Sequence, residues 1–181
     1  QKLTKDESQT FNNSSLLVMR EGIEESSAVS MGLMTWIGRM LVDKQFYLSG
    51  GGYERLSNTY IKIVQHCVIT HNTQREVGLE ICQKVWDVSL ELGKEESMEV
   101  KELAANLALD LLLVLFRLGL TLRSLYQLCK WAPAMVPEQQ QKTVKGIFSF
   151  CAPPYSQAMV KATLNLIKSM PSLDALQIDH E

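Results

Sequence analysis

The apolar residues of this chain recur at intervals of three and four positions over most of its length, which is the spacing of one face of an α-helix. Leu, Met, Ala, Lys, Glu and Gln are common and aromatic residues total only 7%, which favours helices over sheets. The pattern predicts an all-α protein of about eight helices, which cover in order about 15–25, 27–46, 54–71, 73–93, 97–119, 121–132, 137–151 and 156–170.

Several boundaries between these helices are indicated by specific residues. Gly50-Gly51-Gly52 predicts a loop, because consecutive glycines lose much backbone entropy in a helix. Thr73-Gln74-Arg75-Glu76 matches a capping box and predicts a helix start at Thr73. Gly93 predicts a stop, and Pro137 suits the first position of a helix because its missing N–H has no partner there.

The stretch from Leu103 to Leu122 is apolar on nearly all sides and about as long as a membrane span. It also contains Asn106, Asp110 and Arg117, which are costly in hydrocarbon. The stretch therefore predicts a buried central helix, and no membrane span. Asp110 and Arg117 are two turns apart, so they share a side of that helix and are expected to bond to neighbouring helices or to mark its exposed end.

Paired as antiparallel hairpins, the predicted helices begin their pairs near 14, 54, 97 and 137. Intervals of about 40 residues fall within the period of HEAT and armadillo arrays. The chain resembles those families in period and helix count, and carries no residue-level repeat. The resemblance implies a HEAT/armadillo-like α-solenoid segment. The alternative is a compact helical bundle around the central apolar helix, with an apolar groove for a lipid or an amphipathic partner helix.

Length and composition indicate how the chain is organised into domains. With 181 residues, 46% of them hydrophobic, the chain can bury a core without a metal or disulfide. The sequence predicts a flexible polar leader over 1–12, a single helical-repeat domain over 13–171 and an acidic tail over 172–181. The first residue is Gln1, and no signal-peptide pattern follows, so we expect a segment of a longer protein.

The cysteines and histidines form no recognisable chemical motif. Cys67 and His71 share a helix face beside His66, but a zinc site needs three or four ligands and a cysteine nucleophile needs an orienting group and an oxyanion hole. The sequence therefore predicts no enzyme, no cofactor and no metal. All four cysteines lie in apolar helical patterns without a CxxC pair, which favours reduced core residues in the cytoplasm or nucleus: Cys67, Cys82, Cys129 and Cys151.

Charge is distributed unevenly along the chain, although the total is only −2. Residues 1–110 contain 11 Lys and Arg against 16 Asp and Glu, whereas residues 111–173 contain 7 against 1. A basic C-terminal half favours an acidic partner protein or peptide. Nucleic acid is disfavoured, because its binding strips interleave aromatics with many more basic residues.

The sequence thus predicts a non-enzymatic protein–protein interaction scaffold. The expected contact surface joins the helices over 121–132 and 137–151, with Trp131 beside Pro133 as an exposed anchor. Trp36 and Trp86 are expected in the core, since large aromatics mostly bury. The predicted partner-binding residues are Arg123, Lys130, Trp131, Lys142 and Lys145.

Overall fold

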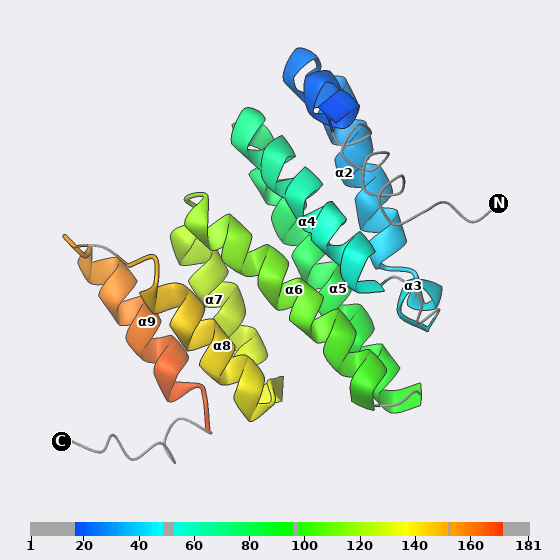
Figure 1. The fold of residues 1–181 in the computed structure, drawn as a ribbon. Coiled ribbons are helices and arrows are strands. Elements are labelled where there is room, and N and C mark those ends of the chain that lie inside the picture. Colours follow the sequence, from blue (N-terminus) through cyan, green and yellow to red (C-terminus); the bar gives the residue numbers. More distant parts are fainter. Residues whose placement is uncertain (1–16, 49–52, 96–97, 152, 172–181) are drawn as a thin grey trace. The chain divides into compact units, whose positions relative to one another are not determined.

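A computed structural model describes residues 17–48, 53–95, 98–151 and 153–171, and every regular element in these ranges is helical (Figure 1). This confirms the all-α prediction. The predicted leader over 1–12, the Gly50–Gly52 loop and the tail over 172–181 lie outside these ranges. After a helix over 17–25 the elements are α2 (Ser27–Leu41), α3 (Lys44–Leu48), α4 (Tyr53–Thr70), η1 (Asn72–Gln74), α5 (Arg75–Glu95), α6 (Met98–Arg117), α7 (Thr121–Trp131), η2 (Ala132–Ala134), α8 (Pro137–Phe148) and α9 (Gln157–Lys168).

The helix predicted over 27–46 is two helices, α2 and α3. The break falls at Val42 and Asp43, where the Asp43 carboxylate accepts a hydrogen bond from the Gln45 backbone N–H at 3.0 Å. A short acidic side chain that bonds the backbone two residues on favours a turn over a continued helix. The Tyr47 hydroxyl then donates to the Leu41 carbonyl, which fixes α3 against the end of α2.

The chain forms two compact units, and the division between Ala105 and Asn106 falls inside α6. We refer to the part up to Ala105 as the first unit and to the part from Asn106 as the second unit. The single domain over 13–171 and the α-solenoid arrangement stay predictions.

In the first unit, α2 packs against both α4 and α5. A Cβ atom at Gly38 would lie 3.1 Å from Ile81 Cγ1, so a glycine here lets α2 approach α5 closely. Trp86 is buried as expected. Trp36, also expected in the core, is 44% exposed and packs edge-to-face on Tyr60 with ring centroids 5.6 Å apart.

The capping box predicted at Thr73 is wrong. Asn72–Gln74 form a 3-10 turn with His71 at the cap position, where its side chain makes no capping bond, and α5 begins at Arg75. Gln74 is fully buried instead: its Oε1 accepts from Ser30 Oγ at 2.7 Å, and its Nε2 donates to the Ser27 carbonyl at 3.3 Å. This amide joins the residue before α5 to α2.

In the second unit, α7 packs along α9, and α8 contacts the C-terminal part of α6 (Figure 1). A Cβ at Gly146 would lie 2.9 Å from Leu113 Cδ1, so this glycine allows the close approach of α8 to α6. Lys142 Nζ lies 2.6 Å from the Asp110 carboxylate across the same interface. The expectation that Asp110 bonds to a neighbouring helix is confirmed.

Candidate functional site

Two of the five predicted partner-binding residues, Trp131 and Lys142, make contacts within the second unit itself. Trp131 is 2% exposed, so the expectation of an exposed indole anchor is wrong. It ends α7 among buried neighbours, because Leu128, Ala132 and Met135 are buried as well. Lys142 forms the ion pair with Asp110 described above, so its charge is matched inside the unit.

The other three predicted residues are exposed on two different helices. Arg123 and Lys130 lie on α7, with Tyr126 between them at a spacing of three and four residues, and Tyr126 is exposed. Lys145 lies on α8, three residues before Phe148. The sequence identified the basic helices correctly, but the exposed aromatics on them are Tyr126 and Phe148 rather than Trp131.

A shallow apolar depression lies where the C-terminal end of α8 meets α9, and we call it the α8–α9 groove. Its volume is about 210 Å³. Only Thr163 among its lining residues carries an aliphatic hydroxyl, and the rest are apolar, aromatic or thiol side chains. The lining residues are Phe148, Cys151, Tyr155, Met159, Val160, Thr163, Leu164 and Ile167.

Helix α9 is fixed at its start, where Ser156 Oγ accepts a hydrogen bond from the Met159 backbone N–H at 3.2 Å. Its inward row, which includes Leu166, is buried against the unit. A second row, Val160 and Leu164, is about half exposed and faces the groove. The sequence carried this signal, because Val160 and Leu164 are apolar residues four positions apart, which places them on one face of a helix.

The far end of the groove is formed by the turn after α8. Phe148 and Tyr155 are each at least half exposed, and Phe150 is nearly so. The Arg117 guanidinium lies 3.9 Å from the Phe150 ring centroid, a cation–π contact that orients this turn against the end of α6. Exposed aromatics gathered at one place favour a binding surface.

Three lysines lie within one helical turn of residues that line the groove. Lys161 and Lys168 stand three residues before and four after Leu164, on the same side of α9, and Lys145 stands one turn before Phe148. The described part of the second unit contains only two acidic residues, Asp110 and Glu138. Asp110 is paired with Lys142, and Glu138 is ten residues from Phe148 along α8, about 15 Å. The groove therefore has an apolar floor and a positive border.

The histidines and Cys67 of the first unit have different partners. His66 Nε2 lies 3.2 Å from the Glu24 carboxylate, and His71 Nε2 lies 2.7 Å from the Ile23 carbonyl oxygen. The Cys67 thiol is buried and points to the Ser30 carbonyl at 3.8 Å. Within the described ranges, no three His, Cys, Asp or Glu side chains gather in a way that could hold a metal ion.

Neither a protein-family model, nor a curated protein, nor a solved structure matches the chain. None of the helices that the structure describes is both long and apolar enough to cross a membrane. The function is therefore inferred from the residues of the two units and their contacts.

Proposed function

We propose that this chain is a non-enzymatic protein-interaction scaffold that binds an amphipathic, acidic helix of a partner protein in the α8–α9 groove. The observation that carries the proposal is the half-exposed apolar row of Val160 and Leu164, which lies beside Phe148 and is bordered by lysines. An apolar floor with a polar border is the usual anatomy of a protein interface.

The dimensions of the groove favour side chains of a partner over a whole small molecule. Its volume of about 210 Å³ is below the roughly 300 Å³ at which small-molecule sites begin. Its floor follows α9 through Val160, Leu164 and Ile167 at helical spacing. A partner helix would insert apolar residues at positions i, i+3 or i+4, and i+7 into such a groove.

The charges favour an acidic partner. Lys145, Lys161 and Lys168 are exposed at the border, and each can pair with a carboxylate on the flank of the partner helix. Single exposed pairs contribute only about 0.2–1 kcal/mol, so the lysines would determine orientation and selectivity while the apolar contact supplies most of the affinity.

Thiol chemistry supports a binding role over an enzymatic one. Burial raises the pKa of all four cysteine thiols above the ordinary value. The thiolate that a cysteine nucleophile requires is therefore scarce at neutral pH. These free, partly buried cysteines also support a reducing location, the cytoplasm or nucleus.

The α-solenoid arrangement is part of the proposal, supported by the period of about 40 residues between helix pairs. Stacked hairpins leave extended surfaces that suit peptides and partner helices. The compact-bundle alternative also provides an apolar groove, so the proposed occupant is the same for either arrangement.

Charge reversal on α9 tests this proposal. The probe is a fluorescent peptide of about 18 residues, long enough to form a helix, with leucines on one face and glutamates on both flanks. Replacing both Lys161→Glu and Lys168→Glu changes two attractive contacts into repulsions, so we expect about tenfold weaker binding by fluorescence anisotropy.

The matched control reverses the same number of charges on α7, as Arg123→Glu with Lys130→Glu. This control should bind the probe nearly as well as the unaltered chain. A greater loss from the α7 pair would place the contact on the surface expected from sequence and contradict the groove. Tighter probe binding after removal of residues 172–181 would make the chain's own acidic tail the occupant, and would also contradict a partner helix.

A further inference from the structure

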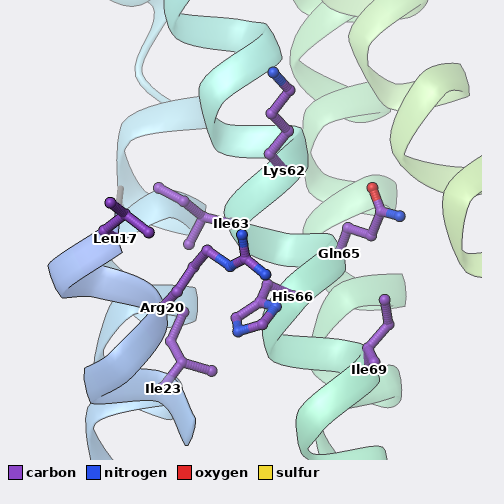
Figure 2. Close-up of a pocket in the computed structure, with 8 residues that line it drawn as sticks. All are labelled: Leu17, Arg20, Ile23, Lys62, Ile63, Gln65, His66 and Ile69. Atoms are coloured by element: carbon purple, nitrogen blue, oxygen red, sulfur yellow. The ribbon is translucent and has the colours of Figure 1, made fainter. Parts of the chain in front are cut away.

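The first unit contains a second concave site, separate from the α8–α9 groove. A cavity of about 570 Å³ lies between the helix over 17–25 and α4 (Figure 2). This volume is within the range of about 300–1,000 Å³ that small-molecule sites occupy. The cavity is therefore large enough for a whole small molecule, whereas the α8–α9 groove is not.

The walls of this cavity combine two kinds of side chain. Leu17 and Ile69 supply exposed apolar surface, one from each helix, and Ile23 and Ile63 are buried beneath. The polar residues that line it are basic or neutral, and no acidic residue is among them. A ligand that matches both kinds of wall has an apolar part and a negatively charged part.

The cationic groups come from opposite walls. Figure 2 shows Arg20 extending from the helix over 17–25 toward α4, where its guanidinium lies next to the His66 ring, while Lys62 leaves α4 one turn away with its ammonium directed away from Arg20. Glu24 already pairs with His66 at 3.2 Å. Arg20 and Lys62 form no ion pair with any residue that the structure describes, so two positive charges at the cavity are unmatched there.

We infer that this cavity binds an anionic amphiphile, a molecule with one carboxylate or phosphate head and an aliphatic chain. The planar guanidinium of Arg20 offers paired N–H donors that match either head group, and the Lys62 ammonium adds a second charge. The aliphatic chain would lie against Leu17 and Ile69, the two lining apolar residues that are exposed. This is a ligand site in the first unit, and it does not depend on the partner helix proposed for the second.

Calorimetric titration of the full chain with soluble amphiphiles tests the inference. Octanoate and octyl phosphate should bind, whereas octyltrimethylammonium, with the same chain and a cationic head, should not. Replacing both Arg20→Gln and Lys62→Gln should weaken binding of the two anions at least about tenfold, because two charge-assisted contacts are removed. Lys84→Gln, an exposed lysine of α5, is the matched control and should bind as the unaltered chain does.

Vesicles distinguish the two sources of such a ligand. Co-sedimentation with phosphatidylcholine vesicles that requires added phosphatidic acid, and that the Arg20/Lys62 double variant loses, would support the inference and identify a membrane lipid as the source. Binding of the free anions without vesicle binding would support it with a soluble ligand. Equal binding of the cationic amphiphile, unchanged binding by the double variant, or no binding by any anion would overturn it.

Discussion

Replacing Trp131 with alanine is expected to lower the free energy of unfolding by about 3–5 kcal/mol, more than the same replacement at Trp36. Its side chain is 2% exposed at the end of α7, and Leu128 and Ala132 beside it in sequence are fully buried. Truncation removes a large apolar surface and leaves a cavity that the packed neighbours cannot fill. Urea unfolding followed by helical circular dichroism measures the loss.

Trp36→Ala is the matched control, because the sequence placed Trp36 in the core and Trp131 on the surface, whereas the structure has the reverse. Trp36 is 44% exposed and retains one ring contact with Tyr60, so its loss should cost about 1–2 kcal/mol. A loss for Trp36→Ala equal to or larger than that for Trp131→Ala would contradict the burial of these two side chains.

Replacing Leu164 with glutamate is expected to weaken binding of the acidic probe peptide about 100-fold, the largest functional effect. Leu164 lines the centre of the α8–α9 groove and is 51% exposed, so the helix tolerates the change while the groove loses its apolar contact. A carboxylate there would be desolvated by the apolar face of the partner helix, would compete with the probe for Lys161 and Lys168, and would repel the glutamates of the probe. Anisotropy titration gives the change in Kd.

Leu122→Glu provides the control for added charge, since Leu122 is also exposed and belongs to the second unit. Glutamate in the first turn of α7 suits the helix dipole, so the fold should be unaffected. We expect little change in probe binding. Equal weakening by both substitutions would mean that net charge, and not the groove, controls binding.

Helices were predictable from this sequence because their signals are local. The apolar spacing, Pro137 at a helix start and Ser156 at another depend on neighbours within one turn, and each of these elements is present. Gln74 shows where local reasoning fails. The sequence places Gln74 inside a predicted capping box, whereas in the fold its side chain forms hydrogen bonds with Ser30 and Ser27, more than forty residues away.

The candidate site was predictable only in part, for the same reason. The basic residues of α7 and α8 could be read from composition, and Lys145 does border the groove. Which aromatics are exposed depends on how the helices pack, so Trp131 was predicted to be exposed although it is buried. Phe148 and Leu164 lie on different helices, so the sequence could not assign them to a shared groove. The ion pair of Lys142 with Asp110 could not be assigned from sequence because Asp110 lies on another helix, and the role of Lys142 in partner binding stays a prediction.

Protection of Cys151 is the measurement that tests the groove most directly. Cys151 lines the groove, whereas Cys129 on α7 is partly buried with its thiol directed at the Ala162 carbonyl, and serves as an internal control. Burial raises the pKa of both thiols, so little thiolate is present at neutral pH. Maleimide labelling is therefore followed by mass spectrometry at about pH 8.5, where thiolate is more abundant. Saturating acidic probe peptide should slow labelling of Cys151 and leave the rate at Cys129 unchanged. Labelling of Cys151 at an undiminished rate while the peptide is bound would contradict a helix in the α8–α9 groove.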